Sequence, residues 1–489
     1  MSVFHGALMR ILLAILILTI STHTFGQAQS PKKSPNLMKI LLESAPILNT
    51  KKPIKVNDLK GKIVLLDFWT YGCVNCMQVI PDLKFLEEKY PKELVILGVH
   101  SAKFENEKGN FEIKKAVARY GIQHPVINDS KFVIWDAFGV DAWPTLVLID
   151  PNGKVHSGYA GEGHRAELDK DIAGLVNQFK GKLSQSKIAL EVSAHKMKYK
   201  FPSKIIEVKN FSSDGKTARD VYFLTDSSHH QIVGLEKNNQ EFLRIGSGKE
   251  GFDDKSMARP QGTAFKKGIL YIADTANNAL RSYDFKSGKL TTLAGDGKRG
   301  NLWASPWDLE FISHDEVAIA MAGTHQLAAF NIATKATRVI AGSGEESMND
   351  GPLPGNSLSQ PSGLSKVGDK LYFVDAETSS LRVLEKGVIT TLIGKGLFDF
   401  GLVDGDVKTA LMQHTTGVFA TEDKVYLADS YNHAVRVYDV KTKKLSTLAR
   451  GLKEPNDVLI SDGFLWVVNT GAHEVVKVDL NTGKINSIK

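Results

Sequence analysis

Two cysteines, Cys73 and Cys76, are the only ones in the 489-residue chain, and two residues separate them. A disulfide between them closes a very short loop and adds little global stability, so the spacing favours redox chemistry over a structural crosslink. One thiolate can attack a substrate disulfide, and the other can resolve the mixed disulfide. A zinc site would need four ligands, and the sequence has no second cysteine pair to complete one.

The cysteine pair lies between a predicted strand and a predicted helix. Residues 63–69 form a continuous apolar run, which is typical of a strand covered on both faces. The stretch that follows, as far as Tyr90, places its apolar residues on one helical face. A helix N-terminus favours negative charge, so we expect Cys73 to be the nucleophile with a lowered pKa. Cys76, one helical turn on, is expected to resolve the mixed disulfide.

Further strands and helices alternate around this centre. Residues 94–99 and 145–150 read as buried strands, and residues 111–120 and 167–179 read as helices. This alternation predicts an α/β domain. We place that domain at residues 29–180.

The chain changes character after a Lys- and Ser-rich linker at residues 181–200. Six similar strands then recur at intervals of 40 to 54 residues, each followed by a short polar turn and a further strand. Short strands repeating at this period are typical of propeller blades. We therefore predict an all-β six-bladed β-propeller at residues 201–489. The six strands end at Asp226, Asp274, Met321, Asp375, Asp429 and Asn469.

The segment around the cysteines resembles the active-site segment of thioredoxin. Residues 67–76 read Asp-Phe-Trp-Thr-Tyr-Gly-Cys-Val-Asn-Cys, and Pro81 matches the proline that kinks the family's active-site helix. Residues 143–145, Trp-Pro-Thr, are similar to the family's cis-proline segment. The extra segment at residues 100–140 resembles the exported TlpA-like branch. The resemblance implies a thioredoxin-like fold.

The same resemblance implies roles for individual residues. Asp67 would be the buried carboxylate that accepts a proton from Cys76, although it could also be purely structural. Pro144 and Thr145 would present backbone to the substrate. The aromatic residues that flank the cysteine pair would border a substrate groove, with simple packing as the alternative; they are Trp69, Tyr71 and Trp143.

The later repeats resemble NHL repeats. Residues 271–281, Tyr-Ile-Ala-Asp-Thr-Ala-Asn-Asn-Ala-Leu-Arg, and residues 426–436, Tyr-Leu-Ala-Asp-Ser-Tyr-Asn-His-Ala-Val-Arg, carry the resemblance. A thioredoxin-like domain followed by an NHL propeller resembles the NHL repeat-containing protein 2 family. That family often has another cysteine before the pair, where this chain has Gly72.

The first residues have the layout of a signal peptide at residues 1–28. Arg10 precedes an apolar core at residues 11–20, and small residues follow at Gly26 and Ala28, either of which would precede the cut. An uncleaved anchor is the alternative, but it needs about 20 apolar residues, roughly twice this core. We therefore expect an exported, periplasmic or secreted protein with no membrane span after cleavage.

Other site classes find less support in the sequence. The 61 basic and 54 acidic residues are spread along the chain, without the basic blocks that nucleic-acid binding requires. Residues at one repeated turn position include four histidines, but turns spread around a ring cannot converge on a metal, so we expect hydrogen bonding that stabilises the turns. These residues are His230, Asn278, His325, Ser379, His433 and His473. A propeller enzyme with a metal in its central channel would lack a ligand set.

The leading hypothesis is an exported thiol–disulfide oxidoreductase whose propeller docks a protein or peptide partner. It needs no cofactor beyond a redox-active Cys73–Cys76 disulfide, and it implies an unidentified redox partner. Long inter-blade segments at residues 343–359 and 395–413 are expected to help form the partner face. The rival hypothesis is a non-enzymatic binding or scaffold protein with an inert cysteine pair. The direction of electron flow, the substrate, the propeller ligand and the oligomeric state stay open.

Overall fold

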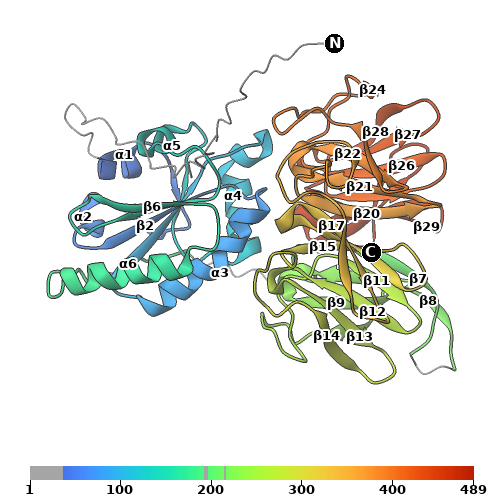
Figure 1. The fold of residues 1–489 in the computed structure, drawn as a ribbon, viewed down its shortest axis with the longest axis horizontal. Coiled ribbons are helices and arrows are strands. Elements are labelled where there is room, and N and C mark those ends of the chain that lie inside the picture. The colour runs from blue at the N-terminus through green and yellow to red at the C-terminus, as the bar shows by residue number, and fades with distance from the viewer. Residues whose placement is uncertain (1–36, 192–196, 214–215, 489) are drawn as a thin grey trace, which may run out of the picture.

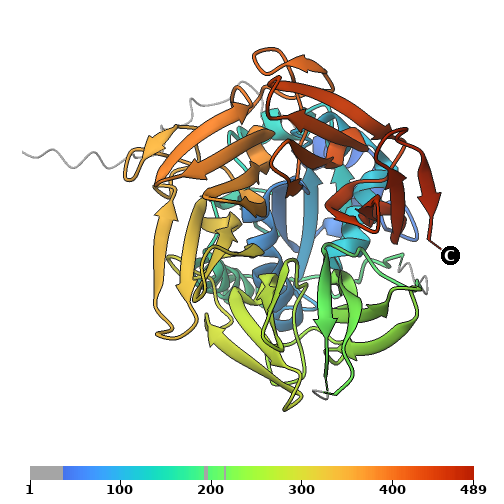
Figure 2. The same ribbon diagram turned by 90° about the vertical axis from the view of Figure 1, so that its right-hand side faces the viewer.

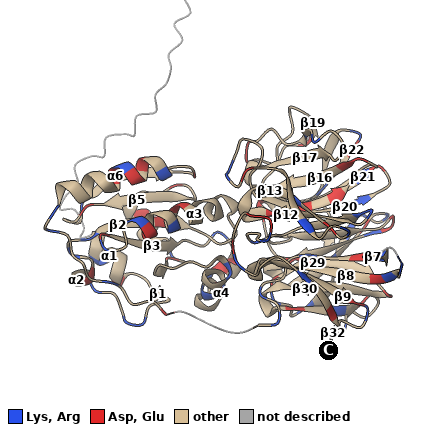
Figure 3. Ribbon diagram, turned by 90° about the horizontal axis from the view of Figure 1, so that it is seen from below, with Lys and Arg blue, Asp and Glu red and all other residues tan. Residues whose placement is uncertain are grey.

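A computed structural model describes residues 37–191, 197–213 and 216–488. Two domains lie side by side, the N-terminal α/β domain and the C-terminal propeller (Figure 1). The expected signal peptide at residues 1–28 lies outside the described residues. Among the described residues, acidic and basic residues are scattered along the ribbon of both domains (Figure 3).

The N-terminal domain is built on a six-stranded sheet in the order β1-β4-β3-β2-β5-β6. Its central strand, β2, is buried at all seven positions, as its unbroken apolar sequence predicts. It runs parallel to β3 and antiparallel to β5. The strands are β1 Ile47–Leu48, β2 Ile63–Trp69, β3 Leu94–His100, β4 Val126–Asn128, β5 Thr145–Ile149 and β6 Val155–Ala160.

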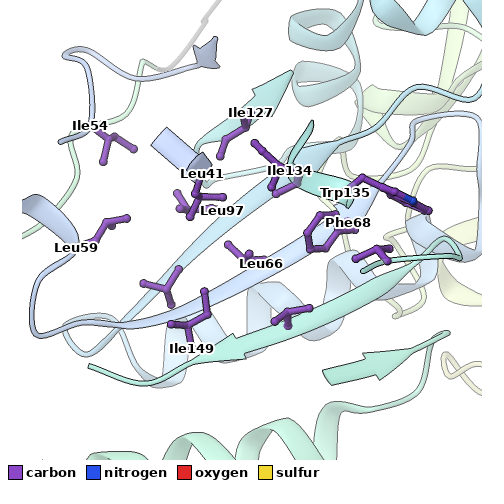
Figure 4. Close-up of a cluster of buried hydrophobic side chains, with 14 residues drawn as sticks. Leu41, Ile54, Leu59, Leu66, Phe68, Leu97, Ile127, Ile134, Trp135 and Ile149 are labelled. Carbon is purple, nitrogen blue, oxygen red and sulfur yellow. The ribbon is translucent and has the colours of Figure 1, made fainter. Parts of the chain in front are cut away.

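Helices cover both faces of this sheet. On one face, α3 and α6 pack against β2 and β3 through residues such as Leu83 and Ile172. On the other, α1 and α5 cover Leu66, Phe68 and Leu97 (Figure 4). The helices are α1 Leu37–Glu43, α2 Val56–Leu59, α3 Val74–Lys89, α4 Asn110–Tyr120, α5 Val133–Phe138 and α6 Arg165–Gln178, with a 3₁₀ turn η1 at Glu105–Lys108.

The C-terminal domain is a ring of six antiparallel sheets (Figure 2). The first three blades are β7 Ile205–Phe211, β8 Arg219–Asp226, β9 Gln231–Glu236 and β10 Glu241–Ile245; β11 Thr263–Lys266, β12 Ile269–Asp274, β13 Ala279–Asp284 and β14 Lys289–Ala294; and β15 Pro306–Phe311, β16 Glu316–Met321, β17 Gln326–Asn331 and β18 Thr337–Ala341. Each blade uses consecutive strands, so the six repeated strands of the sequence are the second strands of the six blades.

The last three blades follow the same plan. They are β20 Pro361–Val367, β21 Lys370–Asp375, β22 Ser380–Glu385 and β23 Val388–Ile393; β25 Gly417–Ala420, β26 Lys424–Asp429, β27 Ala434–Asp439 and β28 Lys444–Arg450; and β29 Pro455–Ser461, β30 Phe464–Asn469, β31 Glu474–Asp479 and β32 Ile485–Ser487. Short strands from two inter-blade segments, β19 Gly351–Pro352 and β24 Gly405–Asp406, extend the fourth and fifth blades.

The ring closes between the first and last blades through side chains and loops. Tyr222 packs against Trp466 with ring centroids 4.3 Å apart and the rings tilted. The Ile205 N–H donates to Asp457 at 3.0 Å, and Asn456 donates to the Ser203 carbonyl at 2.9 Å. These contacts join the two ends of the propeller into one closed ring.

A buried Asp–Arg pair repeats at the same positions in three blades. Arg382, for example, donates to Asp375 at 3.0 Å, and both side chains are fully buried. The third blade has Met321 and Ala328 at these positions, both in its apolar core. The pairs are Asp274–Arg281, Asp375–Arg382 and Asp429–Arg436.

The side chains at the repeated turn position make hydrogen bonds, but these bonds join neighbouring blades, whereas bonds that stabilise the turns themselves were expected. Each of its six residues ends a 3₁₀ turn and has a left-handed backbone. In each case its side chain accepts the N–H of a residue at the entrance to the following blade, as His325 Nδ1 does from Gln360 at 3.1 Å. The other acceptors are His230, Asn278, Ser379, His433 and His473.

Candidate redox site between the two domains

Cys73 is the N-cap residue of α3. Its Sγ accepts a hydrogen bond from the Cys76 N–H at 3.1 Å, so the first turn of the helix directs a backbone donor at this sulfur. Cys76 is buried and 2% exposed, whereas Cys73 is partly exposed. Both are free thiols in the structure. The predicted helix-start position of the pair is therefore confirmed.

Asp67 lies on β2 in the apolar interior of the domain. It is 3% exposed, and its Oδ1 has no hydrogen-bond partner. Burial raises the pKa of this carboxyl to about 7. Burial also raises the pKa of the Cys76 thiol, with a smaller contribution from the Asp67 charge. A carboxyl with a pKa near neutrality can both take up and release a proton under physiological conditions.

Pro144 lies at a cis peptide bond after Trp143, matching the arrangement that the thioredoxin resemblance implied. Trp143 is half-buried and packs on Trp135, with ring centroids 4.6 Å apart. Thr145 is also half-buried, and its backbone pairs with Phe68 on the strand that leads to the cysteines. The cis-proline segment and the cysteine loop therefore lie at the ends of adjacent strands.

The two remaining aromatic residues differ in position. Trp69 is only 1% exposed and packs edge-on against His100 inside the domain, with ring centroids 5.0 Å apart. Tyr71 stacks on His100 and also contacts Tyr431 of the propeller. Their roles as substrate contacts stay predictions.

Glu107 is a site residue that sequence reasoning missed. It is fully buried, and its carboxylate accepts the Gly72 N–H at 2.8 Å and the Lys103 and Phe104 N–H groups at 2.9 Å. Burial raises its pKa to about 7. Glu107 thus holds the loop before Cys73 against the segment before α4. Its position in a charged surface-like run, Glu-Asn-Glu-Lys, gave no sign of this burial.

The propeller covers the cysteine loop. Gln360, at the entrance to the fourth blade, accepts the Val74 N–H at 2.8 Å and donates to the Gly72 carbonyl at 3.0 Å. Figure 2 shows the N-terminal domain behind the propeller ring. The face involved carries the 3₁₀ turns and the inter-blade segments, and we call it the turn face.

The expected partner face is therefore occupied in part by the protein's own N-terminal domain. Phe400, in the predicted partner segment 395–413, packs against Phe104 with ring centroids 4.8 Å apart. An ion pair between Lys103 and Glu377 joins the domains nearby, and each side chain is only 7% exposed. Aromatic contacts and a buried ion pair thus surround the redox loop on the turn face.

This docking overturns the expected low pKa of Cys73. Burial raises the pKa of the Cys73 thiol, and the hydrogen bonds from Cys76 lower it by less. Charges on Glu377 and Glu346 of the propeller raise it further. The prediction considered only the local helix N-terminus, whereas the second domain removes water from the same sulfur.

Among residues 37–191, 197–213 and 216–488, no three or more His, Cys, Asp and Glu side chains are arranged to hold a metal ion. Within the same ranges, no helix has the length and apolar character needed to cross a membrane.

Comparisons with known proteins agree with this architecture. The chain is 36% identical to human NHL repeat-containing protein 2 over 511 aligned residues, which cover 90% of this chain and 69% of that protein. It belongs to the NHL repeat-containing protein 2 family. Residues 61–155 match the family described as Thioredoxin-like, and residues 371–489 match a family described as a repeat of unknown function.

Two other relatives are similar to most or part of this chain. Protein SUPPRESSOR OF QUENCHING 1, chloroplastic, of Arabidopsis thaliana is 39% identical over 90% of this chain, and the match spans 46% of that longer protein. Thiol-disulfide oxidoreductase ResA of Bacillus anthracis is 30% identical over 33% of this chain and 93% of its own length. The N-terminal domain is therefore related to thiol-disulfide oxidoreductases.

Proposed function

We propose that this protein is an exported thiol–disulfide oxidoreductase in which Cys73 and Cys76 exchange electrons with a protein substrate. The observation that carries the proposal is the position of Cys73 at the helix N-cap, with the Cys76 N–H bound to its sulfur. The relationship of the N-terminal domain to thiol-disulfide oxidoreductases supports it.

The exchange has two steps. The Cys73 thiolate attacks one sulfur of a substrate disulfide, forms a mixed disulfide and releases the other substrate sulfur as a thiolate. Cys76 then loses its proton to Asp67 and attacks Cys73 Sγ, which releases the second substrate thiolate and forms the Cys73–Cys76 disulfide. The substrate gains two electrons, and a thiol reductant must regenerate the cysteine pair. The reverse sequence oxidises a substrate dithiol.

The propeller contributes the second wall of this site. Phe398, in the segment at residues 395–413, is 71% exposed beside the covered cysteine loop. Lys103 lies 5.3 Å from the centre of its ring. An exposed aromatic at the rim of a redox site suits a protein partner, which would bury it on binding. The signal-peptide layout of residues 1–28 supports export to a periplasmic or secreted location.

Trapping with single-cysteine variants tests the proposal. Cys76→Ser should accumulate mixed disulfides with envelope proteins, because the resolving thiol is absent. Cys73→Ser is the matched control and should trap nothing. Wild-type protein should reduce insulin with a dithiol reductant, and both variants should lose this activity. Failure of wild-type protein to reduce insulin, together with no trapping by Cys76→Ser, would refute the proposal.

A specific observation favours a second candidate, a non-enzymatic scaffold. The cysteine loop is covered by the turn face, and burial raises the pKa of Cys73, which weakens it as a nucleophile at neutral pH. In this case the cysteine pair would serve the interface between the domains. The proteins captured by wild type and by Cys73→Ser separate the candidates, because a scaffold predicts the same partner set for both.

A further inference from the structure

A ring of six residues on the turn face contacts the N-terminal domain. One residue at the entrance to each blade has a left-handed backbone, with φ between 44° and 65°, although none is glycine. Such a backbone is uncommon for residues with a side chain and persists only where the surroundings enforce it. The ring consists of Phe201, Arg259, Ser305, Gln360, His414 and Glu454.

The same type of hydrogen bond holds each of the six ring residues. Their backbone N–H groups donate to the six repeated turn residues of the preceding blades, at 2.8 to 3.1 Å. This repeated bond fixes the direction of each ring residue. The backbone is therefore sixfold repeated, while the six side chains are all different.

Each of these side chains contacts a different part of the N-terminal domain. Arg259 donates to the Tyr120 carbonyl at 2.6 Å, and Glu454 lies 3.4 Å from the Lys115 ammonium. His414 packs on Phe104 at 5.1 Å between ring centroids. Ser305 accepts a hydrogen bond from Gln78, and Phe201 lies under the Arg119 guanidinium. The N-terminal domain has no sixfold symmetry, so each blade presents a different side chain to it.

Only one ring residue binds the backbone on both sides of Cys73. Gln360 is 2% exposed, and its amide joins the Gly72 carbonyl to the Val74 N–H. Val74 is the first residue of α3, so its N–H is one of the helix-terminal donors that favour a thiolate. The side-chain oxygen of Gln360 accepts the hydrogen bond from this N–H group.

We propose that Gln360 is a positioning residue of the redox centre, contributed by the propeller, which holds the cysteine loop and engages the Val74 N–H. The assignment rests on the proposed thiol chemistry of Cys73 and adds a form of control to it. While the domains are docked, Gln360 keeps one helix-terminal donor away from the sulfur. Separation of the domains would free the Val74 N–H and expose the Cys73 thiol at the same time.

Several other ionisable groups face Cys73; in the test Cys76 is replaced by serine in every variant, and the others stay unchanged. Their charges influence the titration of the sulfur, so each must be common to all variants compared. They are Cys76 on α3, Lys103 and Glu107 from the segment before α4, and Glu346, Glu377 and His414 from the propeller.

The test measures alkylation of Cys73 by iodoacetamide against pH in the full chain. Gln360→Ala, Gln360→Glu and Arg259→Ala are each compared in a Cys76→Ser background, so that one thiol reacts. Gln360→Ala should speed alkylation at pH 7 by about fivefold, the worth of one hydrogen bond. Gln360→Glu should slow it and move the profile to higher pH, because a carboxylate then faces the thiolate. Arg259→Ala controls for looser docking alone.

Opposite effects of alanine and glutamate at position 360 support the positioning role. If both variants speed alkylation as Arg259→Ala does, Gln360 is an ordinary docking contact and the proposal is wrong. Unchanged rates would also overturn it. Circular dichroism of each variant verifies that it is folded. Failure of wild type to reduce insulin, together with no trapping by Cys76→Ser, would refute the oxidoreductase proposal without affecting this alkylation comparison.

Discussion

Tyr71, two residues before Cys73, packs edge-on against Tyr431 of the propeller with ring centroids 5.6 Å apart. Tyr431 also contacts Phe104 and stacks on His414, with ring centroids 5.5 and 4.3 Å away. Aromatic residues of both domains therefore form one cluster beside the redox loop. Access to Cys73 depends on how firmly this cluster holds the two domains together.

Removing the Tyr431 ring should expose Cys73. One aromatic pair contributes about 0.5–1.5 kcal/mol beyond its buried area, so Tyr431→Ala should raise Cys73 alkylation by up to about tenfold. Tyr431→Phe keeps the ring and should stay within about twofold of wild type. Equal effects of the two variants would show that the hydroxyl, and not the ring, holds the domains.

Asp67→Asn should change stability in a pH-dependent way. Asp67 has a pKa of about 7 in the folded protein against 3.8 in its unperturbed state. Its stabilising contribution is therefore full below about pH 4 and is lost as the pH rises to about 7. Since each pH unit corresponds to 1.36 kcal/mol, wild type should lose up to about 4 kcal/mol over this range that the amide variant does not lose.

Thermal melting at pH 4 and pH 8 measures this difference. Asp67→Asn should be the more stable protein at pH 8, and its advantage should shrink at pH 4. The same variant should slow disulfide exchange, because an amide cannot accept the proton of Cys76. Equal pH dependence in both proteins would show that Asp67 does not titrate in this range.

Phe398→Ser should weaken capture of protein partners. The ring is 71% exposed, so its loss should leave folding unchanged. In a Cys76→Ser background, the yield of mixed disulfides should fall by roughly fivefold, as expected for one aromatic contact of about 1 kcal/mol. Phe111→Ser is a matched control, since Phe111 is 69% exposed on the N-terminal domain. A similar fall in the control would rule out a specific role for Phe398.

Arg382→Ala should destabilise the propeller strongly, because Asp375 would remain buried without its cation. Breaking a buried pair in this way typically costs about 3–5 kcal/mol. Adding Asp375→Met reproduces the apolar pair Met321 and Ala328 of the third blade and should recover part of the loss. Calorimetric melting temperatures of the single and double variants test this order, and a less stable double variant would contradict it.

Local patterns in the sequence were sufficient to predict both folds. The apolar run at β2 and the repeated second strands are short-range signals that burial on both faces imposes. The helix that follows the cysteines was also predicted, although it begins at Val74, which makes Cys73 the N-cap. The Asp–Arg positions recur in register because each blade repeats the same core.

The contacts between the domains could not be predicted in this way. Gln360 binds Val74 across 286 residues, and no periodicity links the two positions. Glu107 lies in a polar run that resembles a solvated surface, yet it is fully buried. The predicted direction of the Cys73 pKa shift was wrong for the same reason. The propeller, which removes water from the sulfur, is distant from Cys73 in sequence.

The consecutive order of strands within each blade has a consequence for how this propeller can be rearranged. No described strand of the first blade completes the last blade, so the junction between them consists of side-chain and loop contacts, such as Tyr222 on Trp466. Cutting the chain in an inter-blade loop, before β19 or β24 where the loop carries one of these strands, would leave every sheet intact. Circular permutants that start at different blades should therefore fold. They would place the tether of the thioredoxin-like domain at a chosen point around the ring.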